Sequence, residues 1–73
     1  MYSYQTKIGV FYIVHRNGRW HAMYQDESLG SYISPQHAAD DLAGGHTFSL
    51  PNGVDTSTLG IPEDISEWLY KKL

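Results

Sequence analysis

The dipeptide Asn17-Gly18 constrains the fold of this chain more than any other feature of its sequence. It separates two runs that are rich in β-branched and aromatic residues, 8–15 (IGVFYIVH) and 19–25 (RWHAMYQ). A type I′ turn needs positive φ at both central residues, and Asn-Gly adopts that conformation readily. The sequence therefore predicts a β-hairpin whose strands are joined by a two-residue turn.

A two-residue turn also sets the register of the hairpin. The expected cross-strand pairs are Arg16–Arg19, His15–Trp20, Val14–His21, Ile13–Ala22, Tyr12–Met23 and Phe11–Tyr24. Since side chains alternate between the faces of a strand, one face carries Phe11, Ile13, His15, Trp20, Ala22 and Tyr24. The other face carries Val10, Tyr12, Val14, Arg16, Arg19, His21 and Met23. We expect the first face to pack against a helix, because it combines bulky aromatic residues with a small alanine.

The segments around the hairpin indicate further strands. Residues 1–7 have no clear period, and we expect them to be frayed. Residues 29–33 (LGSYI) follow a turn and predict a third, shorter strand. Residues 47–49 offer a short fourth strand inside the connection 44–60, which is long for a compact domain and is therefore either functional or packed on the core.

Two helices are expected after the third strand. Ser34 can cap the first helix, Pro35 suits its first position, and Gly44 is expected to end it in the left-handed conformation. The narrow apolar stripe of this helix consists of Ala38, Ala39 and Leu42. Residues 62–72 predict a second helix. Its apolar face would consist of Ile65, Trp68, Leu69 and Leu73.

Together these segments predict an α+β fold in which a three-stranded antiparallel meander is packed by two helices. Residues 8–73 would form a single small domain. We expect both Trp20 and Trp68 to lie in its core. In such a meander the strand 8–15 lies at an edge, and its apolar edge would favour aggregation. We therefore expect residues 46–49 to cover it, or a second copy of the chain to form a homodimer through it.

Composition and charge exclude several classes of protein. The chain has no cysteine, which excludes disulfides and thiolate metal sites and fits a reducing cytoplasm. The apolar run 8–14 is too short to span a bilayer and does not resemble a signal peptide. We therefore expect a cytoplasmic protein that does not associate with a membrane. The net charge is −3, and no Lys or Arg lies between Arg19 and Lys71.

Three groups of residues are candidate sites. Tyr12, His21 and Met23 share one face of the hairpin, and aromatic and methionine residues are enriched at protein interfaces. They predict contact with a protein partner whose identity the sequence does not give. The alternative is that the connection 44–60 and the second helix cover this face.

The tip of the hairpin, residues 15–21, is the second candidate. Arg16 and Arg19 could hold phosphates while Trp20 stacks on a base, which is how nucleic-acid-binding modules work. Two arginines in an acidic chain are few for phosphate binding. Nucleic acid is therefore the less favoured partner.

The third candidate combines His37, Asp40 and Asp41, which share one side of the first helix, with His46 just beyond its end. Imidazole and carboxylate groups can bind zinc or carry out acid–base chemistry. The spacing matches no established metal or catalytic motif, so we expect neither an enzyme nor a bound cofactor. The aspartates lie unfavourably near a helix C-terminus, and we expect Arg16 or Arg19 to offset one of them.

Residues 38–68 (AADDLAGGHTFSLPNGVDTSTLGIPEDISEW) resemble a recurring block in a family of small proteobacterial proteins of unknown function. The motif GRW at residues 18–20, on the second expected strand, is similar to the same family. The resemblance implies a cytoplasmic bacterial protein and assigns no activity or substrate. The leading hypothesis is a non-enzymatic module that binds another protein.

Overall fold

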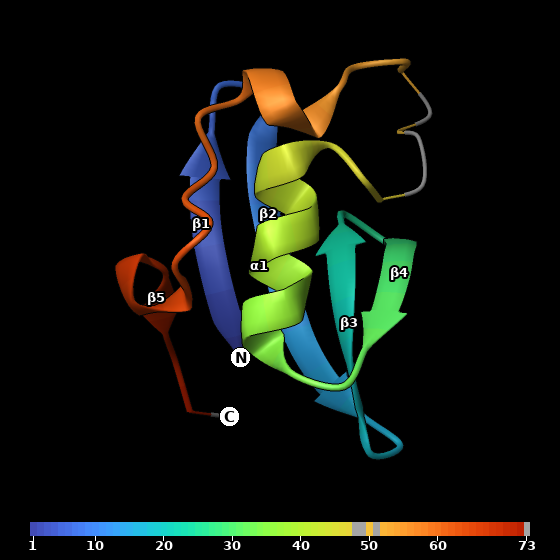
Figure 1. Ribbon diagram of the computed structural model, residues 1–73, viewed down its shortest axis with the longest axis vertical. Coiled ribbons are helices and arrows are strands. Elements are labelled where there is room, and N and C mark those ends of the chain that lie inside the picture. The colour runs from blue at the N-terminus through green and yellow to red at the C-terminus, as the bar shows by residue number, and fades with distance from the viewer. Residues whose placement is uncertain (48–49, 51, 73) are drawn as a thin grey trace.

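The computed structural model describes residues 1–47, 50 and 52–72. They form an α+β fold in which α1 lies on one side of an antiparallel sheet (Figure 1). The sheet consists of β1 (Tyr2–Thr6), β2 (Gly9–Arg16), β3 (Arg19–Tyr24), β4 (Glu27–Tyr32) and β5 (Leu69–Tyr70), in the spatial order β4-β3-β2-β1-β5. The helical elements are α1 (Pro35–Gly44) and two 3-10 turns, η1 (Thr56–Thr58) and η2 (Ile65–Glu67).

The central hairpin confirms the predicted register. All six expected pairs occur, from Arg16–Arg19 at the turn to Phe11–Tyr24 at the far end. Asn17 and Gly18 have φ angles of 53° and 75°. The left-handed conformation that the turn needs is therefore present, and the predicted face with Phe11 is the one that packs against α1.

The prediction that residues 1–7 are frayed is wrong. Residues Tyr2–Thr6 form β1, which pairs with β2 along its whole length. The strand 8–15 is consequently interior, and its backbone edge is occupied by β1 rather than by residues 46–49 or by a second copy of the chain. Tyr2 and Tyr4 stabilise β1 because they pack against the core on the side of α1.

The first helix forms nearly as predicted. Ser34 is its N-cap and accepts a hydrogen bond from the His37 amide at 3.2 Å. The stripe Ala38, Ala39 and Leu42 is fully buried against the sheet. The left-handed residue at the end is Gly45 (φ 74°) rather than Gly44, which is still helical.

The prediction of a second helix over residues 62–72 is wrong. Residues Ile65–Glu67 form only the single turn η2, which Asp64 caps, and the chain then extends into β5. The indole N–H of Trp68 donates to the Pro62 carbonyl at 3.1 Å, so the segment closes on itself without a helix. Leu69, which the helical pattern places on the apolar face, is 75% exposed.

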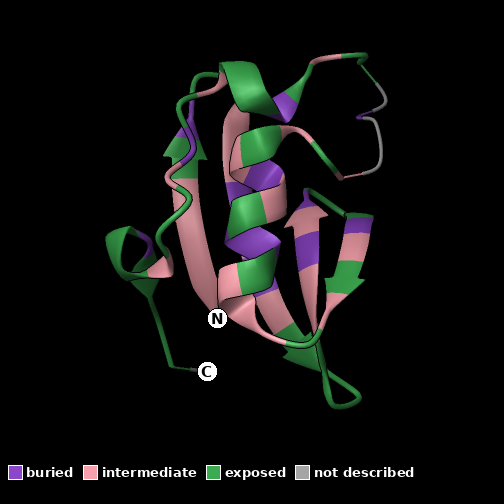
Figure 2. Cartoon of the chain, viewed as in Figure 1, coloured by how far each residue is buried: buried purple, intermediate pink, exposed green. Residues whose placement is uncertain are grey.

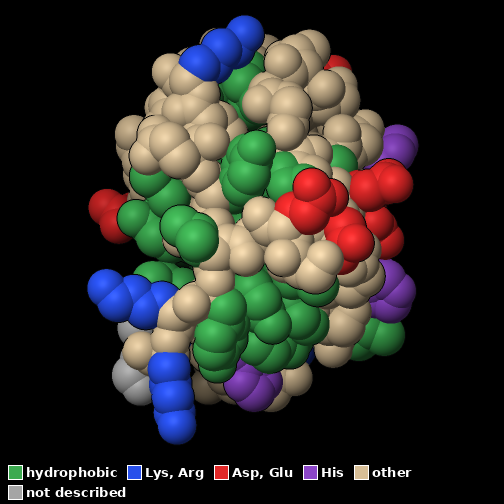
Figure 3. Space-filling view, turned by 90° about the vertical axis from the view of Figure 1, so that its left-hand side faces the viewer, with side chains coloured by type: hydrophobic (Ala, Val, Ile, Leu, Met, Phe, Trp, Pro, Cys, Tyr) green, Lys and Arg blue, Asp and Glu red, His purple; other side chains and the backbone are tan. Residues whose placement is uncertain are grey.

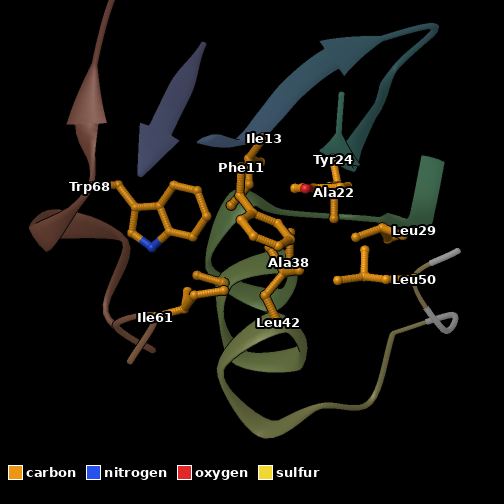
Figure 4. Packing of buried hydrophobic residues seen from close by; sticks show 11 residues of the cluster. Phe11, Ile13, Ala22, Tyr24, Leu29, Ala38, Leu42, Leu50, Ile61 and Trp68 are labelled. Carbon is orange, nitrogen blue, oxygen red and sulfur yellow. The ribbon is translucent and has the colours of Figure 1, made fainter. Parts of the chain in front are cut away.

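The core lies between the sheet and α1 (Figures 2 and 4). Its buried residues are Phe11, Ile13, Ala22, Tyr24, Leu29, Ala38, Ala39, Leu42, Leu50, Ile61 and Trp68. Trp68 is a core residue as predicted, whereas Trp20 is only partly buried against this cluster. Leu29 reaches the core because a β-bulge in β4 inserts it between the residues that pair with Ala22 and Met23.

The connection between α1 and η1 is only partly described. Residues 48 and 49 of the optional fourth strand lie outside the described residues, and Thr47 belongs to no strand. In the described chain, no helix is both long and apolar enough to cross a membrane.

Candidate protein-interaction face

The side of the sheet opposite α1 is the open face of the molecule. On β2, Phe11 and Ile13 point toward α1 and are fully buried, whereas Val10, Tyr12 and Val14 point the other way and remain partly exposed. The two 3-10 turns lie beside α1, and β5 joins the edge of the sheet. The described part of the C-terminal segment therefore leaves the open face uncovered.

A hollow of about 410 Å³ lies on the open face. It is lined by Met1, Tyr12, Val14, Arg16, Met23, Gln25 and Asp26. The structure brings Tyr12 and Met23 together as a direct cross-strand pair, and His21 lies on the same face opposite Val14. Sequence reasoning missed Met1 because it treated residues 1–7 as frayed.

Arg16 and Arg19 lie at the hairpin tip, at one end of the open face. The Arg19 guanidinium donates to the hydroxyl of Ser31 and, at 3.0 Å, to its carbonyl oxygen. Arg16 has no hydrogen-bond or ion-pair partner in the part of the chain that the structure describes. Trp20 lies on the opposite face, where it stacks on His15 with 4.6 Å between ring centroids. The three residues of the alternative nucleic-acid site are therefore divided between two faces.

Asp40 and Asp41 of α1 both have hydrogen-bond partners on the side of the sheet where α1 lies. Asp40 accepts a hydrogen bond from Gln36 at 3.1 Å. Asp41 adjoins the Tyr32 hydroxyl; burial, together with the hydrogen bond and negative charge of Asp41, raises the pKa of Tyr32 to about 12. The prediction that an arginine offsets an aspartate is wrong, because the sheet separates α1 from the open face to which Arg16 and Arg19 belong.

The residues of the alternative metal site do not gather into one group of ligands. His37 is exposed on α1, whereas His46 lies beyond the helix against Gly44. His46 also acts electrostatically on Asp55, although the two hydrogen bonds from Ser57 are the larger reasons that the pKa of Asp55 lies below its usual value. Among the residues described, no three His, Asp or Glu side chains lie close enough together to hold a metal ion.

An aromatic cluster lies on the other face of the sheet, at the end near the hairpin tip. Tyr2 contacts both Trp20 and Tyr70, with ring centroids 5.9 Å and 4.9 Å apart. Figure 3, which views the molecule from the side of β5, shows hydrophobic side chains gathered at its lower end. Tyr70 is 61% exposed. Sequence reasoning missed this cluster because it depends on β5.

Comparisons with protein families, with curated proteins and with solved structures found no match for this chain. The resemblance of residues 38–68 to a proteobacterial family stays a prediction. The chemistry of the open face is therefore the basis on which a function can be proposed.

Proposed function

We propose that the chain is a non-enzymatic module that binds a protein partner through its open face. The observation that supports this proposal is the apolar centre of that face, formed by Tyr12, Val14 and Met23. When one face of an antiparallel sheet meets water, its side chains are usually polar. Aromatic and methionine side chains at the centre of an exposed face are instead typical of surfaces that pack against another protein.

The border of the open face also fits a protein interface. Arg16, Arg19 and Asp26 are exposed around the apolar centre, and Gln25 and His21 add hydrogen-bonding groups. A polar rim around an apolar centre is the usual anatomy of an interface. Charges in such a rim orient the partner and increase the association rate more than they add to affinity.

The geometry favours this function over the two alternatives. For nucleic acid, the stacking residue Trp20 is on the face opposite to Arg16 and Arg19, so phosphate contact and base stacking would not occur together at the open face. For a metal site, His37, Asp40, Asp41 and His46 do not supply three ligands that lie together among the described residues.

A capture experiment tests the proposal with a matched pair of variants. Met23→Glu places a charge at the centre of the open face, whereas Ile33→Glu places the same charge at an apolar residue that is 71% exposed and lies after β4. Immobilised wild-type chain and both variants are incubated with lysate of cells that produce the protein, and bound proteins are quantified by mass spectrometry. We expect a protein that wild type and Ile33→Glu retain and that Met23→Glu loses. Identical captured proteins for all three chains would contradict the proposal.

NMR titrations distinguish the alternatives. Duplex DNA, single-stranded RNA and zinc are added in turn to the labelled chain. Saturable shifts at Arg16 and Arg19 with nucleic acid would support the nucleic-acid function instead, and shifts of His37 and His46 with zinc would support the metal site.

A further inference from the structure

The hollow on the open face has opposite charges at its two ends. Arg16 lies at the end of β2, and Asp26 lies in the turn between β3 and β4. Phe11 pairs with Tyr24, and Asp26 lies two residues beyond Tyr24, so the two charges are separated by about seven residues along the strands, or roughly 23 Å. That distance is too long for them to pair within one chain. Like Arg16, Asp26 has no partner among the described residues.

We propose that the partner on the open face is a second copy of this chain, packed face to face about a two-fold axis. This inference rests on the proposed function, because it names the occupant of the same face. The two-fold axis lies midway between the two sheets and is perpendicular to their strands. Such an axis reverses the strand direction of the second copy, which brings Arg16 of each copy over Asp26 of the other.

A second copy matches the open face better than an acidic or basic peptide does. A peptide of one charge would satisfy Arg16 or Asp26 and leave the other without a partner, whereas the two-fold arrangement pairs both in each copy. The apolar residues Tyr12, Val14 and Met23 would interdigitate with their copies, as in a β-sandwich whose sheets lie about 10 Å apart. A long arginine side chain can extend along such an interface to the Asp26 carboxylate of the other copy, in the turn that follows β3.

The edges of the sheet are less suitable for self-association than its face. The β4 edge carries a β-bulge and the charged Glu27, and the β5 strand has only two residues. Short, bulged and charged edges oppose pairing with another strand. A homodimer is therefore expected to form through the open face, rather than through strand pairing.

Charge reversal tests the two-fold arrangement. Sedimentation measurements over a concentration series give the dimer dissociation constant of wild type, Arg16→Glu, Asp26→Arg and the double variant. We expect a concentration-dependent dimer for wild type and a dissociation constant at least about tenfold higher for each single variant. The double variant restores both pairs with their charges exchanged, so its dissociation constant should return to within about threefold of wild type.

Lys71→Glu is the matched control. It changes the net charge as much as Arg16→Glu does, but Lys71 follows β5 at the edge of the sheet and does not line the hollow. Its effect on the dissociation constant should therefore stay within about threefold. A larger effect, equal to that of Arg16→Glu, would show that general charge rather than a specific pair governs association, and would overturn the arrangement.

Two further outcomes separate this inference from the proposed function. A wild-type chain that stays monomeric up to about 1 mM, the limit of weak association, would overturn the dimer. If Met23→Glu still abolished capture of another protein, the open face would remain a binding site for that protein. If the chain were monomeric and Met23→Glu left capture unchanged, both the dimer and the proposed function would be wrong.

Discussion

At the scale of single residues, Gly45 explains how α1 ends. Its φ of 74° lies in the left-handed region, and its amide bonds to the last turn of the helix. A Cβ atom at this position would collide with the carboxylate of Asp55. Gly45 is therefore favoured for two reasons: its left-handed φ suits glycine, and Asp55, which caps η1, approaches it too closely for a side chain.

Gly45→Ala should lower the free energy of unfolding more than Gly60→Ala does. Gly60 has a similar φ of 70° but open space around it, so its substitution costs only the backbone strain, about 1–2 kcal/mol. At Gly45 the collision with Asp55 adds roughly 1–3 kcal/mol. Urea denaturation of both variants measures the difference, and equal losses would show that Asp55 moves aside freely.

Tyr32 is the residue whose titration reports the packing of α1 on β4. Its pKa is about 12, whereas the ordinary value is 10.0, mainly because of burial and secondly because of Asp41. Between these values the unfolded chain loses the Tyr32 proton while the folded chain keeps it. The stabilising contribution is therefore complete below pH 10 and is lost as the pH rises toward 12.

Asp41→Asn should lower the pKa of Tyr32 only part of the way toward 10, because burial remains. NMR titration of the tyrosine ring resonances measures this change. A Tyr32 pKa that is the same in wild type and Asp41→Asn would show that the carboxylate does not act on the hydroxyl.

At the scale of elements, β1 protects a strand that would otherwise be an apolar edge. A two-residue turn makes Arg16–Arg19 a hydrogen-bonded pair, so the backbone groups of even-numbered residues in β2 point to β3. The amides of Phe11 and Ile13 then point to β1, where they face Tyr4 and Tyr2. These two amides distinguish a paired β1 from a frayed one.

Hydrogen exchange should be slow at the amides of Phe11 and Ile13. The Tyr12 amide, which points to β3, is an internal reference because its protection does not depend on β1. Fast exchange at Phe11 and Ile13 beside slow exchange at Tyr12 would mean that β1 does not pair stably with β2.

At the scale of the whole molecule, one layer of core residues between the sheet and α1 carries the stability. Trp68 closes this layer from the C-terminal segment, where it contacts the ring of Tyr4 at 5.7 Å between centroids. It is 5% exposed, whereas Trp20 is only partly buried. The stability of the domain therefore depends more on Trp68 than on Trp20.

Trp68→Ala should cost about 3–5 kcal/mol, as expected for removing a large aromatic side chain from a core. Trp20→Ala should cost less, because part of the Trp20 side chain already meets water. Thermal and urea unfolding of both variants tests this order. A Trp68→Ala protein that unfolds like wild type would show that the C-terminal segment is dispensable for the fold.

The sequence by itself determined the features that depend on near neighbours. Asn17-Gly18 specified the hairpin and its register, and Ser34-Pro35 specified the start of α1, because a turn and a helix cap are made by residues within a few positions of each other. The face of the hairpin that carries Tyr12 and Met23 followed from that register. The α+β class and the burial of the α1 stripe could be predicted for the same reason.

Only the tertiary structure decided how the ends of the chain are used. Residues 1–7 lack a period of their own and become a strand because β2 offers them a partner. The pattern of residues 62–72 is compatible with a helix, yet Trp68 is buried through an irregular segment that ends in β5. Pairing between positions nearly seventy residues apart, such as Tyr2 with Tyr70, leaves no local trace, because its stability comes from contacts that form only when the sheet is assembled.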